Sequence, residues 1–199
     1  ATFDLRTLGY VTSVKNQGQC GSCWTFATCA SIESYWLRQG QGTFDLSEDN
    51  INNCHDFDWT PCNGGNAMIS AAYVSRGSGM MTEASDPYND VAGTCPTTIN
   101  PIKYVSDVRY VSADQALIKQ ILYDYGAVYT SYFSDDAYLN SSNNTYYYSG
   151  TEYANHAVTI VGWDDTKVTA GGTGAWLIKN SWGTSWGASG YFYCSYNDS

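Results

Sequence analysis

Positive charge is scarce in this sequence. Lys and Arg together number 9 against 19 Asp and Glu, which gives the 199 residues a formal net charge of −10. A surface with this charge repels a phosphate backbone, so nucleic acid is excluded as an expected partner. Long apolar runs are also missing, since none approaches the roughly 18 residues that a membrane-spanning helix needs. We therefore expect no membrane partner.

Charged residues of both signs make up only 14% of the chain, well below the share of roughly 25% in a typical soluble domain. Tyr is frequent, at 18 residues, and uncharged polar residues are abundant. This composition favours a secreted protein over a cytosolic one. The length allows one large domain or two small ones, and a chain of this size can bury roughly 70% of its unfolded surface.

Cysteine, in contrast, is plentiful, at seven residues. That number favours an oxidising compartment, and an odd count leaves one thiol unpaired if the other six form bridges. Cys23 is the natural unpaired residue. The first four residues do not resemble a signal peptide, so we expect a mature and soluble form.

The first half of the chain is predicted to be mostly helical. Residues 23–39 lack Gly and Pro and repeat apolar side chains at near-helical spacing. Ser47, which two acidic residues follow, is a good N-cap, and residues 65–76 form a further helix. Ser112 and Gln115 predict a capping box for a fourth helix.

After residue 126 the pattern changes to strands. Runs of β-branched and aromatic residues cover 127–133, 156–163, 175–179 and 190–196. The polar stretches 140–150 and 164–174 are expected to be surface loops. A helical half and a strand half suggest two lobes, with a site in the cleft between them.

A reactive cysteine is predicted at residue 23. Residues 17–24 (QGQCGSCW) place this thiol among small residues at the start of a predicted helix. A free thiol has a pKa of about 8.5, and a helix N-terminus with a neighbouring imidazolium can lower it to roughly 3–4. The alternative is that Cys23 is buried or disulfide-bonded.

Only two histidines are available to act with this thiol. His55 lies in an Asp-rich stretch between two cysteines, and we expect a solvated side chain there. His156 is left as the base that takes the proton of Cys23, gives it to the leaving group and then activates water.

The chain resembles the papain-like cysteine peptidases in several segments that follow the order of that family. They are FDLR at 3–6, QGQCGSCW at 17–24, LSE at 46–48, CNGG at 62–65, NHA at 155–157, KNSWG at 179–183 and GYF at 190–192. His156 lies 133 residues after Cys23, within the separation of roughly 130–150 residues that is typical of the family.

This resemblance implies an α+β fold with a helical N-terminal lobe, an antiparallel β-barrel-like C-terminal lobe and the active site in the cleft between them. We expect a single papain-like catalytic unit over 1–199, with a helical lobe at 8–107 and a β lobe at 108–199 that also includes 1–7. The family also implies two disulfides, Cys20–Cys62 and Cys54–Cys95. Cys29 and Cys194 do not match the family's usual third bridge, so they either pair with each other, which we prefer, or remain buried thiols.

The resemblance further assigns catalytic roles. Asn180 would orient His156, and Trp182 would cover that hydrogen bond from water. The Gln17 side-chain amide and the Cys23 backbone N–H would bind the oxyanion of the attacked carbonyl.

The resemblance also names residues that would bind substrate. Gly64 and Gly65 would let an extended substrate backbone approach closely, although a helix-opening turn would also explain them. The walls of the pocket that selects the substrate side chain would be Asn66, Ala67, Ser131 and Ala157, which are smaller or more polar than the apolar walls often seen.

The sequence thus predicts a cysteine endopeptidase that cuts peptide bonds through a thioester at Cys23, with no metal or organic cofactor. The alternatives are an inactive papain-like binding module and a Cys-His-Asn exopeptidase or acyl hydrolase. No inserted loop with extra histidines or basic residues is visible near the cleft segments, which favours the endopeptidase. Expected partners are polypeptide substrates and, before maturation of a zymogen, an inhibitory propeptide. We expect a monomer in a secreted or extracytoplasmic location, or in a lysosome-like compartment in a eukaryote.

Overall fold

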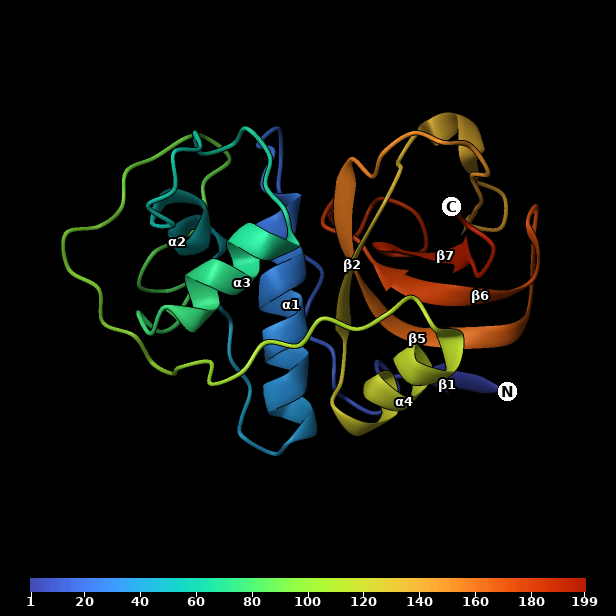
Figure 1. The fold of residues 1–199 in the computed structure, drawn as a ribbon, viewed down its shortest axis with the longest axis horizontal. Coiled ribbons are helices and arrows are strands. Elements are labelled where there is room, and N and C mark those ends of the chain that lie inside the picture. The colour runs from blue at the N-terminus through green and yellow to red at the C-terminus, as the bar shows by residue number, and fades with distance from the viewer.

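The computed structural model describes residues 1–199 as a group of helices beside one β-sheet (Figure 1). The helices are α1 (Cys23–Arg38), α2 (Glu48–Asn53), α3 (Ala67–Ser75), α4 (Gln115–Asp124) and the short 3-10 helix η1 (Asp136–Tyr138). The strands are β1 (Thr2–Asp4), β2 (Val128–Tyr132), β3 (Leu139–Asn140), β4 (Thr145–Tyr146), β5 (His156–Thr169), β6 (Gly172–Lys179) and β7 (Tyr191–Ser195). None of the helices has the length and apolarity that crossing a bilayer demands.

Strand β5 organises the sheet. The seven strands run in the order β1-β5-β6-β7-β4-β3, and β2 also pairs with β5. All pairings are antiparallel except that of β4 with β7. The expected α+β class is confirmed, although the sheet stays unclosed and does not form a complete barrel.

Side chains at the helix starts explain why the helices begin where they do. The Ser47 hydroxyl accepts the Asn50 N–H, as predicted, and Asn66 caps α3. The predicted capping box of Ser112 and Gln115 is wrong, because Asp114 caps α4 instead. A carboxylate adjoining the first turn satisfies its free N–H groups and its positive dipole end better than a hydroxyl farther away.

Two separate hydrophobic cores underlie the two halves of the molecule. One surrounds Trp24 on α1 and includes Ile51 and Tyr73 from the other two N-terminal helices. The second lies under the sheet, around Phe192 and Val161. Figure 1 shows α1 lying next to β2 and β5, so the two cores meet along this helix. The lobe boundaries proposed from the sequence stay a prediction.

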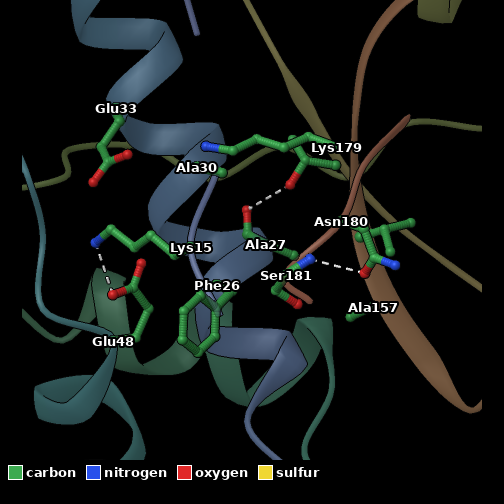
Figure 2. A pocket seen from close by; sticks show the side chains of 12 residues that line it. Lys15, Phe26, Ala27, Ala30, Glu33, Glu48, Ala157, Lys179, Asn180 and Ser181 are labelled. Atoms are coloured by element: carbon green, nitrogen blue, oxygen red, sulfur yellow. Dashed lines mark hydrogen bonds and ion pairs between the residues drawn. The ribbon is translucent and has the colours of Figure 1, made fainter. Parts of the chain in front are cut away.

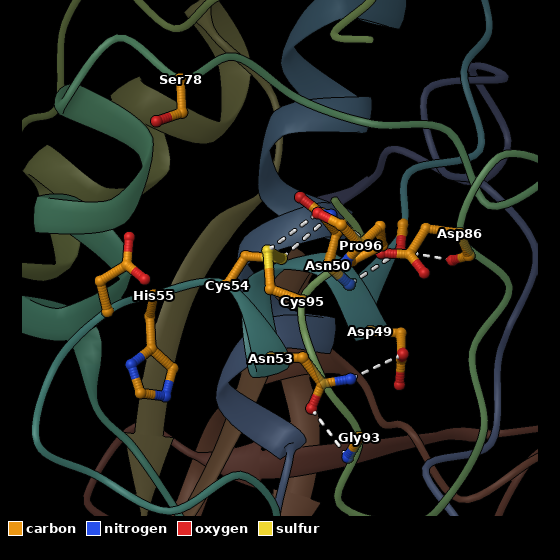
Figure 3. Close-up of a disulfide and its surroundings, with 12 residues drawn as sticks. Asp49, Asn50, Asn53, Cys54, His55, Ser78, Asp86, Gly93, Cys95 and Pro96 are labelled. Carbon is orange, nitrogen blue, oxygen red and sulfur yellow. Dashed lines mark hydrogen bonds between the residues drawn. A yellow bond between two sulfur atoms is a disulfide. The ribbon is translucent and has the colours of Figure 1, made fainter. Parts of the chain in front are cut away.

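Two disulfides fix loops to the helical core. Cys20–Cys62 links the segment before α1 to the loop before α3. Cys54–Cys95 links the end of α2 to a long irregular segment, beside which Asn53 donates to Asp49 and accepts from the Gly93 N–H (Figure 3). That segment has little regular structure of its own, and these contacts hold it against the helices.

The preferred bond between Cys29 and Cys194 is absent, and both thiols are free and buried. Cys29 packs in the helical core, whereas Cys194 lies on β7 in the core under the sheet. The two side chains pack in different cores, so no bond joins their sulfur atoms. Burial raises the pKa of both thiols well above the usual value.

The two expected surface loops are partly built into the sheet. Residues 164–174 extend β5 and open β6, where Thr169 pairs with Gly172 across a tight turn. Within 140–150, Thr145 and Tyr146 form β4 and are buried. Neither segment was predicted as a strand from its polar composition, because the pairing with neighbouring strands that forms β4 and the ends of β5 and β6 is not local in sequence.

Candidate active site

Cys23 is the first residue of α1 and is partly buried. Gly21 precedes it closely and exchanges backbone hydrogen bonds with the Cys62–Gly64 turn, so the thiol sits on a doubly anchored loop. The Ala157 N–H points at the Cys23 Sγ atom across 3.4 Å, which brings β5 against the helix N-terminus. Burial raises the pKa of the Cys23 thiol, although the Ala157 N–H acts in the opposite direction.

His156 is the first residue of β5 and lies beside Cys23, since its neighbour Ala157 contacts the sulfur. Its Nε2 atom is 2.8 Å from the Oδ1 atom of Asn180, which leaves Nδ1 for another partner. The Trp182 ring stacks on the imidazole, with 4.6 Å between ring centres. Burial lowers the pKa of His156, while the hydrogen bond to Asn180 raises it in part.

Gln17 is held rigidly beside this pair and is only 7% exposed. Its Nε2 atom donates to the Cys20 carbonyl at 2.9 Å, and its Oε1 atom accepts from the Ser181 hydroxyl at 2.7 Å. A primary amide has two N–H groups, so one remains free after the bond to Cys20. Ser181 was missed in the sequence, although it lies inside the KNSWG segment between Asn180 and Trp182.

Glycine is required at the two positions before α3 for two different structural reasons. Gly64 has φ of +87°, which disfavours any residue with a side chain. A Cβ atom on Gly65 would lie 2.4 Å from the Trp24 indole, so this position admits no side chain. Trp59, which was not predicted as a site residue from the sequence, donates its indole N–H to the Gly64 carbonyl at 2.8 Å.

The predicted pocket residues come from both halves of the chain. Ser131 on β2 pairs with Ala157 on β5, and Ala67 opens α3. The Asn66 side-chain oxygen is engaged in capping α3. Tyr110, for which the sequence offered no signal, reaches from the irregular segment before α4 and donates its hydroxyl to the Ala67 carbonyl.

His55 is not the solvated side chain expected from its Asp-rich surroundings. It is 4% exposed, and its Nδ1 atom accepts the Phe57 N–H at 3.0 Å. Its ring packs against Trp24, 6.0 Å away between centres, and burial lowers its pKa. Local polarity misled the prediction because the ring folds back into the helical core.

A small pocket next to the site includes four charged residues, from both halves of the chain, in its lining (Figure 2). Lys15 contacts Glu48 at 2.8 Å, and Glu33 accepts the Leu46 N–H. Lys179, on β6 beside Asn180, extends toward α1. Burial lowers the pKa of Lys179 and raises that of Glu48 to about 8, although Lys15 pulls the latter down.

Comparison with known proteins decides the family. The sequence profile of the papain family cysteine proteases matches residues 1–199. The chain belongs to this family. Among papain-family relatives, the viral cathepsin of Choristoneura fumiferana nuclear polyhedrosis virus is 34% identical over 98% of this chain and 59% of its own. Digestive cysteine proteinase 2 of Homarus americanus is 32% identical over 98% of this chain and 61% of its own. The chain therefore spans about three fifths of the length of these relatives.

Solved papain-family structures show the same fold. The clostridial cysteine protease Cwp84 after propeptide cleavage superimposes with a TM-score of 0.92 at 29% identity, over 100% of this chain and 54% of that one. Bromelain from Ananas comosus gives a TM-score of 0.81 at 28% identity, over 98% of this chain and 88% of that one. The papain-like fold expected from the sequence is confirmed.

Proposed function

We propose that this chain is a cysteine endopeptidase that hydrolyses peptide bonds through a thioester at Cys23. The observation that carries the proposal is the 3.4 Å contact between the Ala157 N–H and the Cys23 sulfur. Because this contact brings the start of β5 against a thiol at a helix N-terminus, it supports His156, the residue before Ala157, as the base that acts on Cys23. A nucleophile, a base and a residue orienting the base are the elements of a nucleophilic triad.

In the proposed reaction, the proton of Cys23 moves to Nδ1 of His156, and the sulfur attacks the substrate carbonyl carbon. The C–N bond then breaks, His156 gives its proton to the leaving amine, and a thioester remains on Cys23. His156 next removes a proton from water, which attacks the thioester carbonyl. Cleavage of the C–S bond releases the carboxylic product, and the sulfur recovers its proton from His156.

The burial of Cys23 and His156 favours a thiolate and an imidazolium that form together over either ion alone. Burial raises the pKa of Cys23 and lowers that of His156, so neither side chain is stabilised as an isolated ion. Proton transfer between them creates a thiolate and an imidazolium side by side, and each then stabilises the other. The N-terminal end of α1 adds a favourable dipole for the thiolate.

The remaining residues act on the transition state. Asn180 orients the His156 ring, and Trp182 shields their hydrogen bond from water. The free N–H of Gln17 and the backbone N–H of Cys23 are the proposed donors to the oxyanion. Extended substrate would pair along Gly64 and Gly65, next to the small-walled pocket, and we propose a preference for small or polar side chains there.

A labelling experiment tests the nucleophile. We expect iodoacetamide near pH 5 to alkylate Cys23 faster than Cys29 or Cys194, which are free thiols in the same chain that are 0% and 7% exposed. Peptide mapping gives the three rates from one sample. The Cys23→Ala variant should fold normally and lose casein hydrolysis. Equal labelling of the three thiols, or casein hydrolysis by the variant, would refute the proposed mechanism.

Detection of internal casein fragments separates an endopeptidase from an enzyme that trims chain ends. An endopeptidase generates internal fragments from the first minutes of digestion, whereas an exopeptidase releases single residues or dipeptides from the ends. Mass spectrometry of early digests distinguishes these two patterns. Release of terminal residues alone would replace the endopeptidase proposal with an exopeptidase.

A further inference from the structure

His55 is a buried histidine that the proposed reaction does not use. Its ring packs against the rings of Trp24 and Phe57, whose centres are 6.0 and 5.7 Å away. Its Nδ1 atom accepts the Phe57 N–H at 3.0 Å, so the neutral ring carries its proton on Nε2. This hydrogen bond exists only while Nδ1 has no proton.

The surroundings of His55 favour its neutral form. Burial lowers its pKa below the usual value of about 6.5, and two charged neighbours act in opposite directions, Asp56 raising the pKa and Arg76 lowering it. Arg76, the C-cap of α3, contacts the Asp56 carboxylate at 3.0 Å, which partly compensates that negative charge. Trp24, packed on the ring from α1, carries no charge. The imidazolium therefore forms only in acidic solution.

Protonation of His55 is incompatible with its contact to Phe57. An imidazolium donates from both ring nitrogens, so Nδ1 would present a second N–H to the Phe57 N–H. The hydrogen bond would be lost, and two donors would face each other in a site with little access to water. The ring or the backbone at Phe57 would have to move.

A series of hydrogen bonds connects this contact with the glycines before α3. The Phe57 carbonyl accepts the Trp59 N–H at 2.7 Å, and the Trp59 indole donates to the Gly64 carbonyl at 2.8 Å. The Gly64 N–H in turn donates to the Gly21 carbonyl at 3.0 Å. Gly64 is therefore held on both sides, whereas the N–H and the carbonyl of Gly65 make no hydrogen bond. These two free groups are available to pair with an extended peptide.

Few other contacts hold the 55–61 segment in place. Disulfides fix Cys54 and Cys62 on either side of it, and Figure 3 shows the segment starting at the first of them. Arg76 donates to the His55 carbonyl at 3.0 Å, and the remaining backbone contacts join residues at most five positions apart. Asp56 has a φ of 60°, which residues with a side chain rarely adopt. The turn therefore depends on its hydrogen bonds, including that of His55.

We propose that His55 is a positioning residue for the substrate-binding edge at Gly64 and Gly65, and that this edge binds peptides tightly only while His55 is neutral. The inference rests on the peptidase function proposed above and adds a pH control of its substrate binding. In acidic solution the imidazolium releases Phe57, and the Trp59 indole loses its position. Gly64 is then held on one side only, and KM rises.

The KM of an uncharged fluorogenic peptide at pH 4.5 and pH 7 tests the proposal. In the unaltered chain we expect KM to be about fivefold higher at pH 4.5, the effect of losing one neutral hydrogen bond. In His55→Asn the side-chain oxygen accepts the Phe57 N–H in an Asx turn and does not titrate, so KM should stay constant and low. Trp59→Phe keeps a ring but removes the donor to Gly64, so KM should be high at both pH values.

Asp58→Asn is the matched control, because it changes one exposed charge of the same segment and should keep the fivefold ratio. A KM that rises equally in His55→Asn overturns the proposal, because the titrating group would then lie elsewhere. A fivefold ratio that persists in Trp59→Phe also overturns it, and this variant leaves His55 in place. A KM of the unaltered chain that is the same at both pH values does so as well.

The outcomes also separate this proposal from the peptidase function. Hydrolysis that depends on Cys23, with a KM that does not respond to pH, overturns the role of His55 and leaves the peptidase proposal intact. A failure to hydrolyse any peptide, together with no selective labelling of Cys23, refutes the peptidase proposal itself.

Discussion

Replacing Gln17 with Ala tests whether its amide serves as an oxyanion donor. In the structure this amide is fixed at both ends, by the Cys20 carbonyl and by the Ser181 hydroxyl. One N–H remains for the oxyanion, and one such preorganised donor is worth about 3–4 kcal/mol in the transition state. We therefore expect Gln17→Ala to reduce kcat by roughly 100- to 1000-fold.

Ser181→Ala is the matched control. Both substitutions remove the Gln17–Ser181 hydrogen bond, but only Gln17→Ala removes the donor itself. A neutral hydrogen bond contributes about 1 kcal/mol, so losing the positioning contact alone should reduce kcat by roughly fivefold.

The assay is the hydrolysis rate of a fluorogenic peptide at saturation, with the thermal unfolding midpoint measured for each variant to show that it folds. A similar loss of kcat in both folded variants would contradict the donor role, because the effect would then come from their shared contact. A residual kcat above about one tenth in Gln17→Ala would contradict it as well.

Two further predictions concern the cover of the histidine and the pH dependence of stability. Trp182→Ala should reduce kcat about tenfold, since water then competes for the His156–Asn180 hydrogen bond; an unchanged kcat in steady-state assays would contradict this. Lys119, with other hydrogen-bond donors, holds the pKa of Asp165 well below its usual value. The ionised Asp165 carboxylate therefore stabilises the folded protein fully above about pH 4, and this stabilisation decreases as the pH falls below about 4. Asp165→Asn should cost up to about 1 kcal/mol at pH 7 in urea unfolding and less at pH 2.5; an equal difference at both values would contradict the linkage.

The elements that could be predicted from sequence are those with local signals. Helix α1 ends one residue before the predicted boundary, since residues 23–39 combine helical spacing with a following Gly-rich turn. Strand β7 lies within the predicted 190–196 run, because that run is aromatic and preceded by Gly. In both cases the residues that define the element are adjacent in the chain.

The elements that escaped prediction depend on distant partners. Strand β4 is only two residues long, and it exists because Thr145 and Tyr146 pair with β3 and β7. His55 is buried because Trp24, far away in sequence, offers it a surface. No local pattern encodes either contact, so both were wrongly expected to be exposed.

The candidate site divides in the same way. The sequence named Cys23, His156 and Asn180, and the structure brings the last two within hydrogen-bond distance and the residue after His156 against the thiol. The contact of Gln17 with Ser181 could not be predicted from the sequence. It depends on the relative position of two segments that are 164 residues apart.

That relative position is defined largely by polar contacts across the two cores. Ser31 and Ser34 on α1 bond the Ala127 carbonyl and N–H, respectively, just before β2. Lys179 on β6 donates to the Thr12 hydroxyl, which itself bonds Glu33 on α1. Buried charges of this kind add little net stability, because their desolvation offsets the attraction. Hydrogen bonds are directional, however, whereas apolar packing tolerates small shifts. We infer that these contacts serve mainly to fix the position of one core relative to the other. The distance between the Cys23 thiol and the His156 imidazole depends on that position.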